Sequence, residues 1–190
     1  MPKEKITLRK FIGHLTTVTK HRFLVCKECF AVGLYRQGLC HDLSKYSPTE
    51  FLVGVRYFQG DRSPNNAERE EKGYSASWLH HKGRNLHHYE YWIDYDSRSA
   101  TGMGPIKMPG RYVVEMFADR IAASKVYNGA AYTDRDPLTY YEGGRTAQYL
   151  HPETRALLER LLKMLAERGE EATYAYIRAH LHKSKRPPRP

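Results

Sequence analysis

The chain has 190 residues, of which 41% are hydrophobic and 27% are charged, and its formal net charge is +10. These values suit one domain with a buried core, with or without a helical appendage, and no apolar run reaches the roughly 18 residues of a membrane span. The N-terminus lacks the features of a signal peptide, and three cysteines are too few for a disulfide scaffold, so we expect a cytoplasmic protein.

The first part of the chain is predicted to form helices. Apolar residues recur at three- and four-residue steps across 5–32, which indicates one long helix that ends at a glycine. A second helix is expected across 39–43 and a third across 48–59. Ser47 and Glu50 have the spacing of a capping box at the start of this third helix.

The middle of the chain alternates charged helical segments with turns. Residues 67–81 are predicted to be helical with an interruption near Gly73, and Asn85 is expected to cap another helix across 87–92. The segment 94–110 is rich in Gly, Pro, Ser and Asp, so we expect an irregular surface loop. No period-2 run predicts a strand.

The last part of the chain contains the strongest helical patterns. Residues 111–128 and 152–168 are amphipathic, a short helix is expected near Leu138, and Gly169 separates the second amphipathic helix from a last one across 170–182. The predicted fold class is therefore all-α.

Histidine and aspartate residues are spread over several of these helices. Four short pieces are separated in sequence and could converge in space: His21, His41-Asp42, His80-His81 and Asp119. Imidazole and carboxylate groups are the donors that divalent and ferrous ions use in proteins. The pattern therefore indicates a metal site.

The first helix contains two histidines, either of which could be the metal ligand. His14 and His21 are seven residues apart, share one helix face, and each is followed four residues later by valine. We favour His21 as a ligand and treat His14 as an outer or second-metal candidate. For either residue, a core histidine bonded to a carbonyl or carboxylate is the alternative.

A second ambiguity lies in the segment 78–92, which holds four histidines within nine residues. The sequence does not distinguish His80 from His81 as the ligand. His88 is a further candidate ligand, and His87 is an outer or alternative one.

Three strings resemble motifs of the HD-domain superfamily, which are helical metal-dependent phosphohydrolases: Leu-Cys-His-Asp-Leu-Ser-Lys at 39–45, Trp-Leu-His-His-Lys-Gly-Arg-Asn at 78–85 and Phe-Ala-Asp-Arg-Ile-Ala-Ala at 117–123. The longer strings also look like an uncharacterised prokaryotic family. The Gly-Tyr-Pro extension of the cyclic-dinucleotide branch is absent, so that specificity does not carry over. The resemblance implies a helical bundle over residues 1–150, with 151–182 as a helical cap or homo-oligomer contact.

The same resemblance implies one or two ions (Fe, Mn, Mg, Ni or Zn) that activate water against a phosphoester, with an anionic and nucleotide-like small molecule as substrate. The implied metal ligands are His21, His41, Asp42, His80 or His81, His88 and Asp119. Catalytic roles fall to Asp42, Lys45 and Arg84, while substrate contacts fall to Lys45, Lys82, Arg84 and Lys125.

Two alternatives stay open at this point. Histidine-rich members of the superfamily include di-iron oxygenases, so oxygen chemistry is one alternative. The other is a non-enzymatic nucleic-acid-binding protein stabilised by zinc on Cys26, Cys29, Cys40 and His41, for which the net positive charge is an argument. Four of the positive charges lie in the Pro-rich tail 183–190, which we expect to be disordered and solvated.

Overall fold

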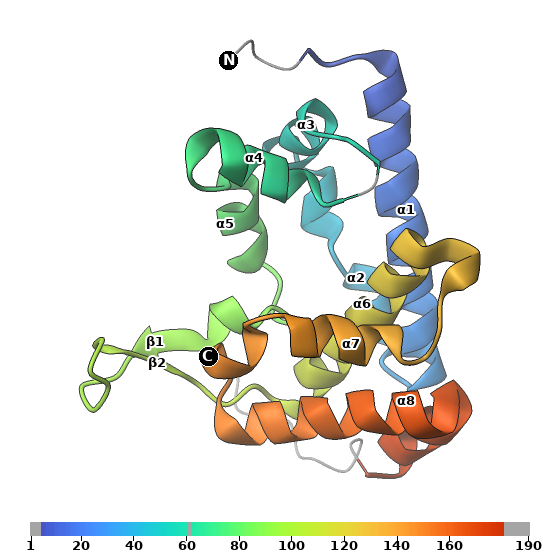
Figure 1. Cartoon of the computed structure of the whole chain (residues 1–190), viewed down its shortest axis with the longest axis vertical. Helices are drawn as coiled ribbons and strands as arrows, with labels where there is room; N and C mark the ends of the chain where they lie inside the picture. Colours follow the sequence, from blue (N-terminus) through green and yellow to red (C-terminus); the bar gives the residue numbers. More distant parts are fainter. Residues whose placement is uncertain (1–4, 61, 181–190) are drawn as a thin grey trace.

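The computed structural model describes residues 5–60 and 62–180, and the tail 183–190 lies outside them. The described chain is mostly helical (Figure 1), which confirms the all-α prediction. Its α-helices are α1 Leu8–Ala31, α2 Tyr35–Cys40, α3 Pro48–Arg56, α4 Pro64–Lys72, α5 Ala76–Lys82, α6 Gly110–Asn128, α7 Asp136–Gly143 and α8 Pro152–His180. Four 3₁₀ turns connect them: η1 Leu43–Tyr46, η2 Tyr89–Trp92, η3 Gly129–Ala131 and η4 Thr146–Tyr149.

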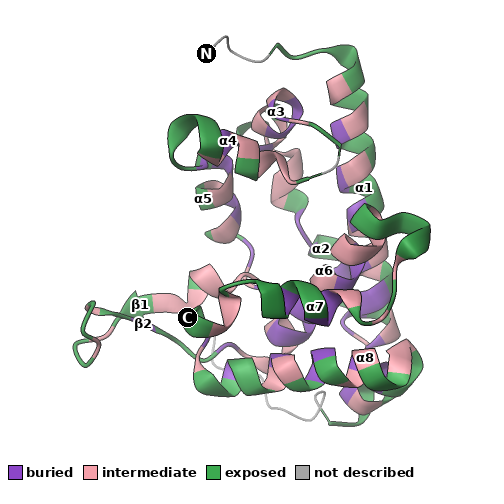
Figure 2. Cartoon of the chain, viewed as in Figure 1, coloured by how far each residue is buried: buried purple, intermediate pink, exposed green. Residues whose placement is uncertain are grey.

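Helices α1, α6 and α8 supply most of the hydrophobic core. Val25 of α1, Phe117 and Ile121 of α6, and Leu158 and Leu162 of α8 are buried in a single cluster. Figure 2 shows buried residues gathered where α6, α7 and α8 meet. The apolar spacing along these helices places one stripe of each inside, and burial of such side chains contributes about 1.5–3 kcal/mol per residue.

Glycines end two helices as the sequence predicts. Gly33 follows α1 with a φ of 79°, and Gly169 has a φ of 77° inside α8. A left-handed φ has little steric cost for glycine, because it carries no Cβ. The segment labelled α8 is therefore two helices that meet at a sharp kink at Gly169, and Ile177 beyond the kink packs on the same core.

Three predictions about the middle of the chain are wrong. The helix expected across 39–43 ends at Cys40. The helix expected across 87–92 is only the 3₁₀ turn η2. The Asn85 side-chain amide donates a hydrogen bond to the His81 carbonyl and does not cap a helix. The expected loop 94–110 contains a two-stranded antiparallel sheet, β1 Ile93–Tyr95 and β2 Met103–Pro105, in which Asp94 pairs with Gly104. In Figure 1 this hairpin projects away from the helices.

No helix in the described ranges combines the length and the apolar character needed to cross a membrane.

Candidate metal centre

A sharp backbone turn places His41 and Asp42 inside the protein. His41 ends α2 with φ −53° and ψ 128°, and Asp42 adopts a left-handed conformation with φ 53° and ψ 26°. Aspartate is among the residues that tolerate this conformation best, although it still costs some energy. The turn buries both side chains, which are 2% and 1% exposed. The two residues therefore converge because of the helix break, whereas the sequence predicted that they lie within one helix.

The first group of donors joins α1, this turn and α6. His21 Nε2 lies 2.9 Å from Asp119 Oδ1 and 3.9 Å from Asp42 Oδ2. His41 Nε2 lies 3.4 Å from Asp42 Oδ2 and 3.7 Å from Asp119 Oδ1. His21, His41 and Asp42 are close enough together for one ion to bind between them, and Asp119 forms a further group of this size with His41 and His87.

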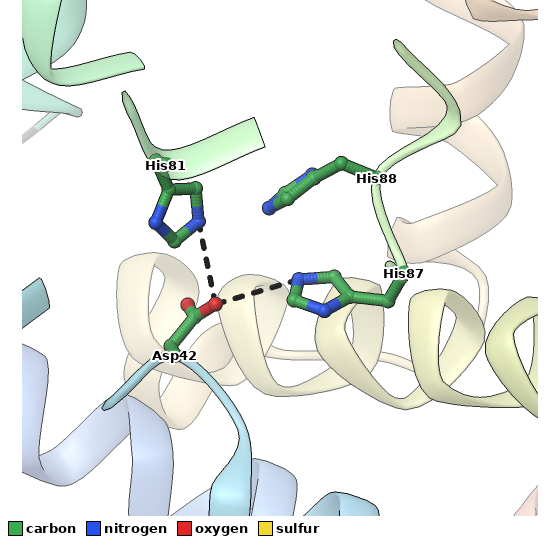
Figure 3. A group of neighbouring side chains, drawn as sticks. All are labelled: Asp42, His81, His87 and His88. Atoms are coloured by element: carbon green, nitrogen blue, oxygen red, sulfur yellow. Dashed lines mark ion pairs between the residues drawn. The ribbon is translucent and has the colours of Figure 1, made fainter. Parts of the chain in front are cut away.

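The second group lies on the other side of Asp42 (Figure 3). His81 from α5, with His87 and His88 from the loop after it, points its ring toward the carboxylate. Asp42 Oδ1 is 3.3 Å from His81 Nε2 and 3.5 Å from His87 Nε2. Since Oδ2 faces the first group and Oδ1 the second, Asp42 is placed to bridge two ions.

Two glutamates hold the opposite nitrogens of these imidazoles. Glu115 of α6 accepts hydrogen bonds from His41 Nδ1 at 3.0 Å and lies 3.2 Å from His87 Nδ1. Glu50 of α3 accepts from His81 Nδ1 at 2.7 Å. A proton on Nδ1 leaves Nε2 of a neutral ring with a lone pair for a metal, and such outer carboxylates fix the ring orientation.

Sequence reasoning missed both glutamates in this role. Glu50 was assigned to a capping box, but the Ser47 side chain makes no cap hydrogen bond, and Glu50 instead faces His80 and His81. Glu115 precedes Asp119 by four residues on α6, so it lies on the same helix face, and this spacing was the available signal.

The Nε2 atoms at the centre form no hydrogen bonds, although those of four histidines lie 2.9–3.5 Å from a carboxylate oxygen. Five buried Nε2 atoms have no hydrogen bond, and they belong to His21, His41, His81, His87 and His88. The buried Oδ1 atom of Asp42 has no hydrogen bond either. A buried polar atom without a partner costs about 1–3 kcal/mol, so this many in one place is costly unless a ligand binds them. A divalent cation is the ligand that a set of imidazole nitrogens and carboxylate oxygens fits.

The electric field at this point favours a positive charge. Burial opposes ionisation of Asp42 and Asp119, but nearby histidines outweigh it, so that the pKa of each carboxyl lies well below its usual range. Burial, reinforced by His87 and His81, lowers the pKa of His88 well below its ordinary value. His88 is thus neutral, which is the form in which imidazole binds metals. Burial opposes the charged form of His41 and His81 as well, but Asp42 outweighs it and raises the pKa of both, so these two rings must lose a proton to bind a cation.

The structure separates the histidines that the sequence left ambiguous. His81, rather than His80, faces Asp42, while His80 bonds Glu50 at 2.6 Å through Nδ1 and belongs to no metal-sized group among the described residues. His21 joins the first group and His14 does not. His87, expected as an outer or alternative ligand, points Nε2 at the centre.

The four predicted substrate-binding cations lie in different places. Lys45 Nζ is 2.7 Å from Asp42 Oδ2, and its side chain is 30% exposed and lines the cavity beside the donors. Arg84 is exposed and bonds the His80 carbonyl, and neither it nor Lys82 lines that cavity. Lys125 pairs with Glu28 at 2.7 Å, away from the donors. The structure therefore places only Lys45 beside the donors, and the substrate contacts expected of Lys82, Arg84 and Lys125 gain no support from it, because motif neighbours on a helix need not point the same way.

A cavity of about 230 Å³ opens onto both donor groups. His21, Asp42, His81, His88, Asp119 and Lys45 line one part of it, and His14, Gly54, Phe58, Ser77, Trp78 and Tyr127 are among the other lining residues. This volume is below the roughly 300–1,000 Å³ of sites for drug-sized ligands, so it suits a small ligand.

The cysteines do not form the alternative zinc site. Cys29 is buried, Cys26 is half-buried and Cys40 is exposed, and all three are free thiols. Within residues 5–60 and 62–180, no group that could hold a metal includes a cysteine.

Comparison with known proteins gives a family but no activity. Neither the curated proteins nor the solved structures contain a significant match to this chain. One family model, described as a family of unknown function (DUF5662), matches residues 10–164, which include all the metal-site candidates described above. The chain therefore belongs to this family of unknown function.

Proposed function

We propose that this protein is a metal-dependent phosphohydrolase of the HD type. The observation that carries the proposal is the convergence of five imidazole nitrogens, none of which forms a hydrogen bond, on the two carboxylates Asp42 and Asp119. The order of these ligands along the chain, and their origin in separate helices and in the turns between helices, agree with the HD-like strings in the sequence.

The donor set fits two divalent ions that share Asp42. His21 and His41 would hold one ion together with Asp42, and His81, His87 and His88 would hold the other together with Asp42. Asp119, which groups with His41 and His87, would complete the donor set. A divalent ion, when bound, acidifies a coordinated water and polarises a phosphoryl oxygen.

The protein's own residues have three tasks in this proposal. Glu50 and Glu115 keep the imidazoles in one tautomer and orientation. Lys45 supplies a positive charge on the cavity side of Asp42, where it can bind phosphate and offset the charge that develops during the reaction. The walls of the cavity limit the size of the organic group.

A di-iron oxygenase is a second candidate, favoured by the same shared carboxylate between two nitrogen-rich groups. The two candidates differ in their metal. An oxygenase requires a redox-active iron pair, whereas hydrolysis proceeds with ions that do not change their oxidation state.

The test uses full-length protein purified without a histidine tag. Elemental analysis should find one to two transition-metal ions per chain, and a panel of phosphomonoesters and phosphodiesters should include a substrate that is hydrolysed only by the metal-loaded protein. A chelator-treated sample, and the same sample after metal is restored, are the controls. Protein that binds no metal would contradict the proposal, and a mixed-valence iron pair without hydrolysis would favour the oxygenase.

A further inference from the structure

His14 is a buried histidine that the proposed metal centre does not use. Its side chain lies in the cavity wall, and the residue is only 8% exposed. No hydrogen bond joins its imidazole to another residue of the described chain, and its nitrogens are not among the atoms sealed from solvent. The imidazole is thus a polar group that can reach only the cavity for a partner.

The surroundings hold the His14 ring in one place. The rings of Phe51 and Phe58 lie 5.2 and 6.1 Å from it, measured between centroids. On another side the ring lies over Gly54, where a Cβ would come within 2.1 Å of His14 Nε2. A side chain at position 54 would therefore displace the imidazole.

The distance of His14 from the proposed metal centre determines which part of a bound ligand it can contact. His14 and His21 are two turns apart on α1, which is on the order of 10 Å along the helix axis. Lys45 lines the same cavity as both histidines. A phosphate held beside Lys45 would leave its organic group extending toward His14.

We propose that His14 is a specificity-determining residue that forms a hydrogen bond with a hydroxyl or ring nitrogen in the organic part of a phosphate ester, with a sugar phosphate or a nucleotide as the substrate class. This inference rests on the proposed function. The ring provides no positive charge for a second anionic group at this end of the cavity, because burial, assisted by Lys45, lowers the pKa of His14 to about 4 and keeps the ring neutral near pH 7.

A polar contact of this kind discriminates strongly between ligands. A ligand without the hydrogen-bonding group would leave the buried imidazole unpaired, and sites built around such a bond reject the analogue that lacks it. Aromatic neighbours alone would select a ligand by its size and shape and not by its hydrogen-bonding groups.

The experiment compares phosphonates, in which carbon replaces the ester oxygen so that they are not hydrolysed. Isothermal titration calorimetry on the metal-containing full chain would use inorganic phosphate, methylphosphonate and the phosphonate analogues of ribose 5-phosphate and AMP. We expect at least one of the last two to bind tenfold or more tightly than methylphosphonate. The ribose arm tests a sugar hydroxyl, and the AMP arm adds the base.

Three variants make the test specific. His14→Phe keeps a ring between the phenylalanines, and it should reduce the tenfold preference to less than threefold without changing the affinity for methylphosphonate. His14→Gln retains a hydrogen-bonding group and should restore part of the preference. His180→Phe, on the exposed end of α8, is a matched control that should match the wild type. Thermal unfolding checks that each variant folds.

The outcomes separate the two proposals. If phosphate and methylphosphonate both fail to bind to the metal-loaded protein, the proposed function is wrong and this inference is wrong with it. If both bind but the wild type shows no preference for the larger ligands, or if His14→Phe keeps the preference, only the role of His14 is overturned.

Discussion

Two buried clusters of charged and polar groups lie at different levels of α1 and α6, and they differ in how their atoms are paired. In the candidate metal centre, imidazole Nε2 atoms gather around Asp42 without hydrogen bonds. In the second cluster, Glu28 of α1 contacts Lys125 of α6 at 2.7 Å and accepts a hydrogen bond from Tyr174 of α8, while Lys125 also contacts Glu170 at 2.5 Å.

The difference separates a binding site from a structural contact. Glu28 is as buried as His41, but its two oxygens have a cation and a hydroxyl as partners, so it requires no ligand. Its contacts join α1 and α6 to the segment beyond the kink of α8. Burial of charge alone therefore does not identify a functional site, whereas convergence of unpartnered donors does.

The largest effect is expected for the carboxylate that both metal groups share. Asp42→Ala removes a ligand from each group, so we expect the metal content to fall to background, which corresponds to an affinity loss of roughly a hundredfold or more, or about 2.8 kcal/mol. Inductively coupled plasma mass spectrometry measures the content. Cys26→Ala is the control and should keep its metal. If Cys26→Ala lost its metal and Asp42→Ala kept it, the alternative zinc site on the cysteines would be favoured instead.

The second cluster should respond in stability and not in metal content. Glu28→Ala leaves Lys125 with Glu170 alone and Tyr174 without its acceptor. Since Lys125 is partly exposed, we expect a loss in the free energy of unfolding of roughly 2–4 kcal/mol, somewhat below that of a fully buried pair. Urea denaturation measures it. Loss of metal in this variant would mean that the two clusters are coupled.

Removal of an outer carboxylate should have an intermediate effect. Glu115→Gln keeps the shape of the side chain but loses the charge that holds His41 and His87. We expect metal affinity to decrease by about 10–100-fold. Titration of chelator-treated protein measures it, with Glu159→Gln, an ion-pair residue of α8, as the matched control. Equal affinities in the two variants would show that Glu115 is a packing residue.

Lys45 and Arg84 test which cations belong to the site. Lys45→Met should leave the metal content unchanged and decrease kcat/KM toward a confirmed phosphoester by about tenfold, or 1.4 kcal/mol. Arg84→Met should have a much smaller effect, because Arg84 is exposed outside the cavity. Full activity of the Lys45 variant would remove the argument for an anionic substrate at this position.

Periodicity predicted the long helices because their structure depends on burial of one stripe. Val114, Phe117 and Ile121 have helical spacing and are buried in α6 as expected. The hairpin was not predicted, because strands of three residues are too short for an alternating pattern. The break at Asp42 was not predicted either, because apolar residues flank it at helical spacing and only the tertiary packing selects the left-handed turn.

Residue types and their order predicted most of the candidate donors, but not their partners. Glu50 shows why: its local spacing from Ser47 matches a cap, and the contact that it makes with His81 joins residues 31 apart. The direction of Arg84 could not be inferred from its neighbour His81 for the same reason. Local sequence patterns predict which side chains are available as donors, whereas the three-dimensional fold determines which of them are in contact.

His14 belongs to neither cluster, and its titration should produce the smallest effect. Its pKa is about 4 in the folded protein, against an ordinary value of 6.5 that applies to the unfolded chain. Between these values the unfolded chain binds more protons, so stability is retained above about pH 6.5 and falls as the pH decreases toward 4. From pH 7 to pH 6 the wild type should lose about 0.7 kcal/mol more than His14→Phe, which lacks the titrating group. Urea denaturation of both proteins at the two pH values measures this difference. Equal losses would mean that His14 is not held neutral by burial, and that the cavity wall is more polar than the fold implies.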